Sequence, residues 1–363
     1  MQEMKTDKKG KKCRLLKVFG LVFGILIFAA AVIAGYYTIR EYRPKPLEEI
    51  QASGGLEVLS EGERITILSY NIGYAGLNQD ADFFMDGGTK VHPENKEEVE
   101  ANLKGISNIL LEQDADVYFL QEVDRDSKRT FHIDELAYYE NVLSLQGMYA
   151  CNFRCDFVPY PIPPIGKVES GIATLTDYKV NSAARIALPE SFKWPIKTCN
   201  LKRCMLETRI PIEGSDKELV LINFHLEAYD SGEGKIAQSK QLAGKLQEEY
   251  EKGNYVIAGG DFNQAFEGMD TYPLISEESW VPGIIGTDDI PENFSFAVTD
   301  NVPTCRLLNA SYSGNYEDSQ VYVLDGFIIS DNLELEGIEN IDTGFAYTDH
   351  QPVKLTVKLA DIP

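Results

Sequence analysis

Acidic, amide and histidine residues stand at the ends of short apolar runs that are typical of strands. Glu122 follows the run VYFLQ, Asp261 and Asn263 follow YVIAGG, and His225 ends LVLINFH. Side chains at strand ends leave the sheet and can converge on one rim. Carboxylate and amide oxygens form a hard site, suited to Mg²⁺ or Mn²⁺ and unsuited to zinc or copper. Such a site would serve phosphoryl chemistry at one end of a sheet.

Four further polar residues fit the same pattern. Asn71 follows the run ITILSY, Asp325 ends VYVLD, and Asp349 and His350 precede the last apolar run. Taken singly, Asn and Asp after a strand usually form turns, and a lone strand-end histidine such as His225 is usually a core residue. An inward carboxylate needs a partner, and a histidine is the natural one. We therefore expect Asp325 to pair with His350 and to orient its ring.

The apolar runs predict the elements that must position these residues. Strands are predicted at ITILSY, VYFLQ, GIATLT, CMLETRI, LVLINFHL, YVIAGG, LDGFIIS and VKLTVKL, several of them buried on both faces. Helices are predicted over 94–113, where Val99, Leu103, Ile106 and Leu110 share one face, and over 235–251. Strand groups with few helices between them indicate an α+β sandwich in which helices cover packed sheets. We expect one such domain over 62–363.

The N-terminus predicts a membrane segment. Val18 to Ile39 are 22 residues without a charge, and seven Lys or Arg precede them. A helix of this length spans a bilayer, and the basic residues before it favour a cytoplasmic position for the N-terminus. We expect a basic cytoplasmic tail over 1–17, a transmembrane signal anchor over 18–39, a stalk over 40–61, and an extracytoplasmic domain at the cell membrane. The alternative is a signal peptide cleaved after Ala34, which would release a secreted domain.

The charge is distributed unevenly along the chain. Residues 1–43 hold nine Lys or Arg and three Asp or Glu, so residues 44–363 hold 25 and 54, a net charge of −29. Such a surface repels phosphate backbones and argues against a broad basic face for nucleic acid. A local group of cations could still grip phosphate, and the candidates lie in loops at strand ends: Arg125, Lys128, Arg129, Lys167 and Arg306. A solvated loop is the alternative for them.

Two other segments leave alternatives open. Residues 153–166, FRCDFVPYPIPPIG, could face a substrate or a membrane, but we favour a connection stiffened by proline. Residues 74–93 could overhang the site or form a plain surface insertion.

Seven motifs in order resemble one known superfamily. These are SYN, LQEVD, ESGIATLT, NFHLE, GGDFNQ, VLDGFIIS and TDHQPV. Together they resemble the endonuclease/exonuclease/phosphatase superfamily, the metal-dependent DNase I-like enzymes, over nearly the whole of residues 62–363. The resemblance implies a four-layer fold in which two mixed sheets pack face to face with helices outside.

The resemblance also implies roles for the residues at the strand ends. Glu122 would be the principal Mg²⁺ (or Mn²⁺) ligand, with Asn71 beside it and Asp349 as a further ligand. The metal would neutralise charge on the phosphate and on the leaving oxygen.

The other matching residues would act on water and phosphate. Asp261 and Asn263 would orient the attacking water and the scissile phosphate, and His225 would contact a phosphate oxygen. His350, supported by Asp325, would act as acid or base or stabilise the transition state. Whether Asp261 or His350 takes the proton from water stays open.

The implied activity is metal-dependent phosphoester hydrolysis, which leaves the ester to be chosen. We expect an extracellular phosphodiesterase acting on a phospholipid head group, a nucleic acid or a small phosphodiester. The alternatives are an exported nuclease for DNA or RNA and a catalytically inactive surface-binding module with the same fold. The sequence predicts contact with the membrane through its N-terminal helix and predicts no protein partner.

Overall fold

The computed structural model describes residues 3–52, 55–230, 232–269, 272–276 and 280–360, with side chains from residue 14 onward. Its helices are α1 (Glu3–Arg40), α2 (Lys96–Gln113), α3 (Glu135–Leu143) and α4 (Glu233–Glu251), with the short 3-10 helices η1 (Gly73–Ala75), η2 (Phe84–Asp86), η3 (Lys128–Thr130), η4 (Ile196–Cys199), η5 (Thr287–Asp289) and η6 (Tyr316–Asp318). Its strands are β1 (Leu47–Ile50), β2 (Arg64–Asn71), β3 (Val117–Asp124), β4 (Gln146–Val158), β5 (Gly166–Thr176), β6 (Ser182–Ala187), β7 (Cys204–Pro211), β8 (Glu218–His225), β9 (Tyr255–Asp261), β10 (Gln264–Phe266), β11 (Gly283–Ile285), β12 (Phe294–Ala297), β13 (Cys305–Arg306), β14 (Val321–Tyr322), β15 (Asp325–Ser330), β16 (Leu333–Asn340) and β17 (Val353–Leu359).

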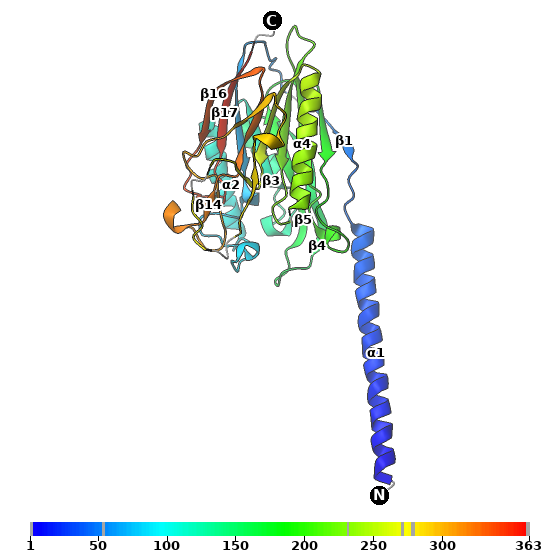
Figure 1. Ribbon diagram of the computed structural model, residues 1–363. Helices are drawn as coiled ribbons and strands as arrows, with labels where there is room; N and C mark the ends of the chain where they lie inside the picture. Colours follow the sequence, from blue (N-terminus) through cyan, green and yellow to red (C-terminus); the bar gives the residue numbers. More distant parts are fainter. Residues whose placement is uncertain (1–2, 53–54, 231, 270–271, 277–279, 361–363) are drawn as a thin grey trace.

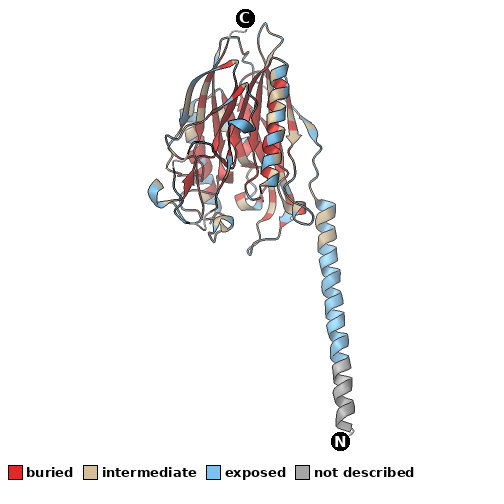
Figure 2. Cartoon of the chain, viewed as in Figure 1, coloured by how far each residue is buried: buried red, intermediate tan, exposed pale blue. Residues whose placement is uncertain are grey.

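Two mixed sheets packed face to face form the body of the domain (Figure 1). In the described residues, one sheet has the order β1-β6-β7-β8-β9-β15-β12 and the other has the order β16-β17-β2-β3-β5-β4. Each sheet contains one parallel pair at its centre, β8 with β9 and β2 with β3. Apolar side chains from both sheets fill the space between them, and Figure 2 shows that the strands of both sheets are largely buried.

Helices α2, α3 and α4 cover the outer faces of the sheets because each packs an apolar stripe on them. Helix α2 begins after Asn95, whose side chain accepts a hydrogen bond from the Glu98 amide at 2.9 Å. Its predicted stripe, Val99, Leu103, Ile106 and Leu110, is buried against the sheet that contains β2 and β3. Helix α4 packs Leu242 and Leu246 on the other sheet. The predicted DNase I-like sandwich is therefore confirmed.

Helix α1 extends away from the domain as one continuous helix (Figures 1 and 2). Its segment Arg14–Arg40 is long enough to cross a membrane, and the most apolar stretch of that segment is not buried in the domain. A signal sequence near an N-terminus has the same properties, so anchoring and sidedness remain predictions. Residues 1–2 of the expected basic tail lie outside the described residues.

The expected stalk over 40–61 is wrong in part. Residues Leu47–Ile50 form β1, which pairs antiparallel with β6 at the edge of the seven-stranded sheet. Further on, the Leu59 side chain is fully buried in the core between the sheets. A four-residue edge strand with alternating exposure carries too little apolar signal to be recognised in the sequence. The folded domain therefore begins before residue 62.

A buried carboxylate fixes α4 to the seven-stranded sheet. Glu249, at the end of α4, is fully buried and accepts hydrogen bonds from Arg209 of β7 at 2.8 Å, from Lys245 at 2.7 Å and from Lys252 at 2.7 Å. Burial opposes its charge, but these three cations lower the pKa of Glu249 well below its ordinary value. A carboxyl with a lowered pKa in the folded state stabilises the fold at neutral pH.

Replacing Glu249 with glutamine is expected to lower the free energy of unfolding by about 3 kcal/mol, because three cations lose their common counter-ion. The contribution exists above the unfolded carboxyl pKa of about 4 and is lost as the pH falls below it. Urea unfolding of the full chain at neutral and acidic pH would measure both effects. The exposed Glu251→Gln is the matched control, and equal midpoints for the two variants at neutral pH would contradict the prediction.

Candidate active site

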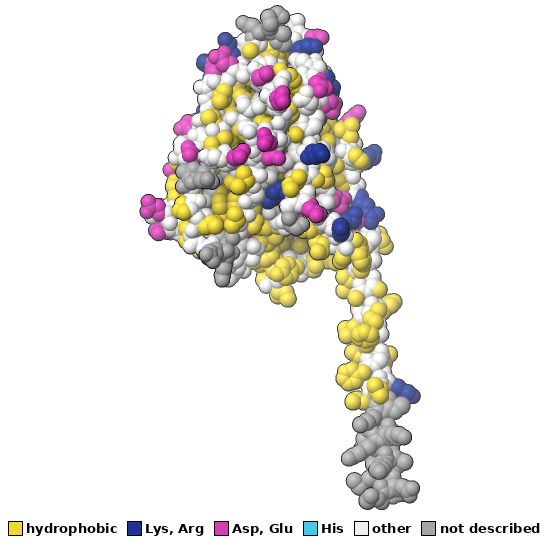
Figure 3. Space-filling view, viewed as in Figure 1, with side chains coloured by type: hydrophobic (Ala, Val, Ile, Leu, Met, Phe, Trp, Pro, Cys, Tyr) yellow, Lys and Arg dark blue, Asp and Glu magenta, His cyan; other side chains and the backbone are white. Residues whose placement is uncertain are grey.

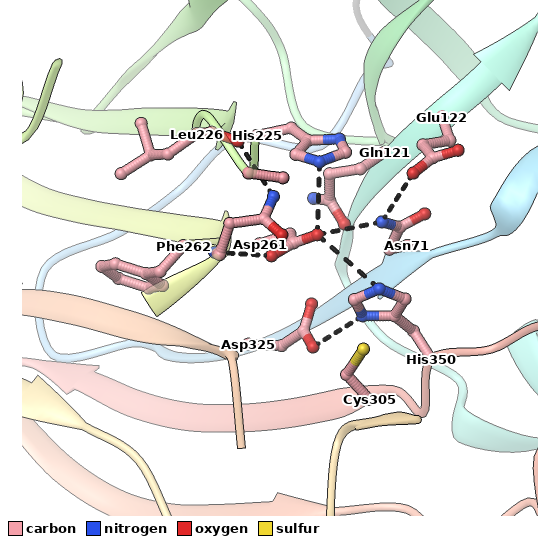
Figure 4. A network of polar contacts seen from close by, with 12 residues as sticks. Asn71, Gln121, Glu122, His225, Leu226, Asp261, Phe262, Cys305, Asp325 and His350 are labelled. Carbon is pink, nitrogen blue, oxygen red and sulfur yellow. Dashed lines mark hydrogen bonds and ion pairs between the residues drawn. The ribbon is translucent and has the colours of Figure 1, made fainter. Parts of the chain in front are cut away.

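Five strand ends bring predicted residues together at one end of the sandwich (Figure 4). Asn71 ends β2, and Glu122 lies near the end of the neighbouring parallel strand β3. His225 and Asp261 end the parallel strands β8 and β9 and lie side by side in the pairing. Asp325 begins β15 directly opposite Asp261. Both sheets therefore contribute side chains to one site.

Glu122 is directed into the site by an irregularity in its strand. The pairing of β3 with β5 shifts between Leu120 and Val123, and Glu122 has a φ of 57°. A bulge turns a side chain out of the regular alternation of a strand, and a non-glycine residue at positive φ is held there by its surroundings. The Glu122 side chain therefore points toward Asn71 at the end of the strands, and not to either face of the sheet.

Asn71 joins the two halves of the site. Its side chain is fully buried, and its Nδ2 donates to Glu122 Oε1 at 3.2 Å and to Asp261 Oδ2 at 3.1 Å. Its Oδ1 accepts from the Gly73 amide at 3.1 Å. In this arrangement Asn71 orients carboxylates that come from different sheets, and its amide oxygen is directed to the backbone.

Asp261 lies at the centre of the polar network. Its Oδ2 is 3.3 Å from His225 Nε2 and 3.7 Å from His350 Nε2, and its Oδ1 accepts from the Asn263 amide at 2.8 Å. Asn263 Nδ2 in turn donates to the Leu226 carbonyl at 2.9 Å. Burial raises the pKa of Asp261 to about 7, although the charge of His350 opposes the shift. Asp261 is therefore able to exchange a proton near neutral pH.

The expected pair of Asp325 and His350 is present. Asp325 Oδ2 lies 2.8 Å from His350 Nδ1, and both side chains are buried. The Asp325 amide donates to Thr304 Oγ1 at 3.1 Å, which fixes the start of β15. Burial opposes charge on the ring, but the nearby Asp325, Cys305 and Asp261 outweigh it and raise the pKa of His350 well above its ordinary value. His350 is thus held as a cation.

His225 is held in the opposite state. Burial, with Arg203 and His350 nearby, lowers the pKa of His225 well below its ordinary value. Its Nδ1 is buried and makes no hydrogen bond within the described part of the chain. The site therefore pairs a neutral histidine with a charged one, on either side of Asp261.

Carboxylates crowd the side of the site next to Glu122. Thr348 Oγ1 lies 3.2 Å from the Asn71 carbonyl and 3.1 Å from Asp349 Oδ1, which places Asp349 beside β2. Burial, together with the negative charge of Glu122, raises the pKa of Asp349 to about 6. Asp86, in the segment 74–93, lies close enough for its carboxylate to repel those of Glu122 and Asp349. A divalent cation would relieve this repulsion, so the hard oxygen donors fit Mg²⁺ or Mn²⁺.

A second group of ligand atoms lies within the network itself. Atoms of Asp261, Asp325 and His350 lie within 4.8 Å of one another and could also hold a metal ion. However, His350 Nδ1 is already bonded to Asp325, and the raised pKa keeps a proton on the ring. A protonated imidazole offers no lone pair to a metal, so the carboxylate side of the site is the better candidate.

Two of the five predicted phosphate-binding cations lie near the carboxylates. Arg129 donates to Asp124 at 2.9 and 2.8 Å, and its guanidinium lies 3.5 Å from the centre of the Tyr74 ring. Arg306 is almost fully buried, and its Nη2 donates to the carbonyls of Asn78 at 2.6 Å and Ala81 at 3.1 Å. Both cations therefore hold residues 74–93 against the site.

The structure does not bring the other three cations to the same place. Arg125 forms an ion pair with Asp134 at 2.7 Å, and Lys167 pairs with Asp126. Lys128 is exposed, and its side chain lies against Gly166. A common phosphate grip formed by all five cations has no support in this arrangement, and a role for each alone stays a prediction.

Sequence reasoning missed three residues around the site. Tyr229 donates to Asp86 Oδ1 at 2.8 Å and so joins residues 74–93 to the loop after β8. Lys235, at the start of α4, is buried, and Asp261 is among the charges that act on it. Asp86 lies in a loop without a recognisable motif. Nothing in the sequence distinguishes Lys235 from the other polar residues of its helix. The only relevant prediction was that residues 74–93 could overhang the site.

Comparison with known proteins agrees with this geometry. The sequence model of the Endonuclease/Exonuclease/phosphatase family matches residues 68–307, which include Asn71, Glu122, His225 and Asp261. The chain belongs to this family. The resemblance recognised in the sequence is therefore confirmed. Members of the superfamily are metal-dependent phosphoester hydrolases. A comparison with curated proteins gives no match.

Solved structures of the endonuclease/exonuclease/phosphatase fold are similar to the chain at low identity. One is an endonuclease/exonuclease/phosphatase from Beutenbergia cavernae DSM 12333, with 17% identity and a TM-score of 0.58 over 83% of this chain and 72% of that chain. Another is ANGEL2, a 2',3'-cyclic phosphatase in complex with adenosine-2',3'-vanadate, with 16% identity and a TM-score of 0.53 over 82% and 96%. The human Nocturnin catalytic domain has 16% identity and a TM-score of 0.50 over 81% and 94%. At this identity the likeness establishes the fold.

Proposed function

We propose that this family member is a metal-dependent phosphodiesterase whose catalytic domain lies outside the cytoplasm. The observation that carries the proposal is the position of Asn71, whose Nδ2 joins Glu122 on one sheet to Asp261 on the other. This bond places a carboxylate side suited to a hard cation directly beside a network of two histidines and two aspartates. The two parts together supply what hydrolysis of a phosphoester requires.

Glu122 and Asp349 would hold the metal, with Asn71 beside them. Mg²⁺ or Mn²⁺ bound there supplies neutralisation of the charge on the phosphate and on the leaving oxygen. Asn71 keeps the Glu122 carboxylate aligned through its bond to Oε1. In the sequence Asn71 was predicted as a ligand, and a role in orienting the ligands is also consistent with its contacts.

The other residues act on the water and the phosphate. Asp261, with a pKa of about 7, is able to accept a proton from a water held beside it. Burial keeps His225 neutral, and its Nε2 lies 3.3 Å from Asp261 Oδ2, so the ring would contact an oxygen of a phosphate bound beside Asp261. His350, charged and fixed by Asp325, would stabilise negative charge that develops on the phosphate. Asn263 keeps Asp261 in position.

Two alternatives are consistent with the fold. An exported nuclease is consistent with the same site, but the net charge of −29 over residues 44–363 works against a long nucleic-acid track. A catalytically inactive binding module would retain the fold. However, every residue that the family pattern requires is present here in a chemically competent type. Phospholipid head groups and small phosphodiesters therefore remain the preferred substrates.

Hydrolysis assays of the full chain in detergent test the proposal. We expect release of p-nitrophenol from bis-p-nitrophenyl phosphate with Mg²⁺ or Mn²⁺, and a loss of about 10³-fold or more when EDTA removes the metal. The monoester p-nitrophenyl phosphate, DNA and RNA are the comparison substrates. Faster cleavage of DNA or RNA than of the small diester would favour the nuclease. An EDTA-resistant rate, or no hydrolysis of any ester by folded protein, would contradict the proposal.

A further inference from the structure

The candidate active site lies at the end of the domain from which α1 leaves. Arg64 at the start of β2 pairs with Lys358 near the C-terminus, and Ser69 pairs with Val353 at the other end of β17. Strand β2 therefore runs away from the C-terminal end of the domain and delivers Asn71 to the opposite end. In Figure 1 the C-terminus lies at the top and α1 leaves at the bottom, so the site and α1 share the lower end.

The last turn of α1 is fixed to the domain by specific contacts. Tyr37 packs with Cys155 of β4 and with Val168 of β5. Trp194 Nε1 donates to Thr38 Oγ1 at 3.0 Å. Thr38 belongs to the uncharged segment Val18–Ile39, so Trp194 lies at the level where that segment ends. The direction in which α1 leaves the domain is therefore set by packing.

An apolar rim surrounds this exit. We define the apolar rim as Tyr160 and Ile162, at the tip between β4 and β5, and Trp194 and Ile196, in the loop before β7. Their side chains are 69%, 94%, 57% and 61% exposed. Figure 3 shows apolar side chains gathered at this lower end, next to the apolar surface of α1. Exposed aromatic and aliphatic groups so concentrated mark a contact surface.

The two loops of the apolar rim share one base. Cys155 Sγ in β4 and Cys199 Sγ in η4 lie 3.2 Å apart, which holds the loop of Trp194 against the strand that leads to Ile162. The tip also touches residues 74–93, since the rings of Phe84 and Tyr160 pack edge to face with centres 5.8 Å apart. Residues 74–93 carry Asp86, next to the metal side of the site. The apolar rim is thus in contact with the loop beside the active site.

We propose that the apolar rim lies in the surface of the same lipid bilayer that α1 enters. Trp and Tyr prefer the level of the lipid head groups, and Ile162 would bury its side chain among acyl chains. The uncharged segment of α1 ends beside Trp194, so a membrane around α1 brings its surface to the rim. The active site then opens toward that surface and acts on phosphoesters presented there. This last step rests on the proposed function.

Tryptophan fluorescence tests the contact without any catalysis. The described chain has Trp194 in the rim and Trp280 packed between Tyr229 and Tyr322. The full chain carrying Trp280→Phe is placed in phosphatidylcholine vesicles whose acyl chains are brominated near the glycerol. We expect the emission of Trp194 to fall about two-fold or more. Tryptophan prefers the level of the head groups, and bromine at that level quenches its fluorescence on contact. Trp194→Phe, which retains Trp280, is the control and should be much less quenched.

A charge on the rim tests the consequence for hydrolysis. Ile162→Asp places a carboxylate at a side chain that is almost fully exposed, so the fold should tolerate it. We expect the ratio of the rate on phosphodiester lipid in vesicles to the rate on bis-p-nitrophenyl phosphate to fall about ten-fold. Leu335→Asp, on β16 near the opposite end of the domain, is the matched control and should leave the ratio unchanged.

The outcomes separate this inference from the proposed function. Trp194 emission unaffected by brominated lipid would overturn the contact, even if the soluble diester is hydrolysed. Quenched Trp194 with no hydrolysis of any ester would support the contact and contradict the proposed function. Quenched Trp194 with an unchanged ratio in Ile162→Asp would overturn access to the substrate from the bilayer.

Discussion

Glu122→Gln is expected to reduce metal-dependent phosphoester hydrolysis by about 10³-fold or more. The substitution keeps the size of the side chain but removes the negative charge that a hard divalent cation needs, and loss of several kcal/mol of charge stabilisation has this effect on rate. The Asn71 side chain can still bond to the new amide, so the network around Asp261 should persist. Initial rates on bis-p-nitrophenyl phosphate at saturating Mg²⁺ or Mn²⁺ would measure the loss.

A binding measurement separates loss of the metal from loss of the fold. A ligand that binds only the folded state raises the melting temperature, so Mg²⁺ or Mn²⁺ should raise that of the parent protein and not that of Glu122→Gln. The exposed Glu112→Gln of α2 is the control and should keep both the activity and the metal-induced shift. Unchanged activity and an unchanged shift in Glu122→Gln would remove Glu122 from the metal site.

His350→Ala is expected to lower the same rate by about 10²- to 10⁴-fold, the range that a positioned acid, base or charge contributes. His350 is charged, buried and held 2.8 Å from Asp325, with Nε2 directed at Asp261. Removing the ring removes both the positive charge and the partner of Asp325. Rates at saturating metal and diester would measure the effect, and metal binding should be nearly retained.

Chemical rescue distinguishes chemistry at His350 from a structural effect. The cavity left in His350→Ala should admit imidazole, which should restore part of the rate in that variant and none in Glu122→Gln. Asp325→Asn keeps the ring but weakens its orientation, so its loss should be smaller and should not respond to imidazole. A rate in His350→Ala within about ten-fold of the parent would contradict the assignment.

The strands and the residues at their ends could be predicted because both signals are local. The runs before Asn71, Glu122 and Asp261 are short and apolar. A polar residue that follows such a run can be recognised from the sequence alone. The pairing of Asp325 with His350 followed from the cost of an unpaired buried carboxylate. These features depend on neighbours in the sequence or on a single strong rule.

The rest of the site depends on contacts between distant segments. The bulge that turns Glu122 arises from the register between β3 and β5, which no local pattern specifies. Arg306 was expected to bind phosphate, but its guanidinium donates hydrogen bonds to the backbone carbonyls of residues 78 and 81. Tyr229 and Asp86 meet across 143 positions of the chain. Such pairs become visible only when the loops are placed around the sheets.

Strand β1 has a consequence for how a protease could separate the folded domain from α1. Because Leu47–Ile50 completes the edge of the seven-stranded sheet, the folded unit begins on the N-terminal side of residue 47. A protease that cut after Ile50 would strip β1 from β6 and expose an unpaired edge that invites aggregation. A cut between Arg40 and Leu47 would release the sheet whole. A stable shed form of this protein would therefore carry β1 at its N-terminus.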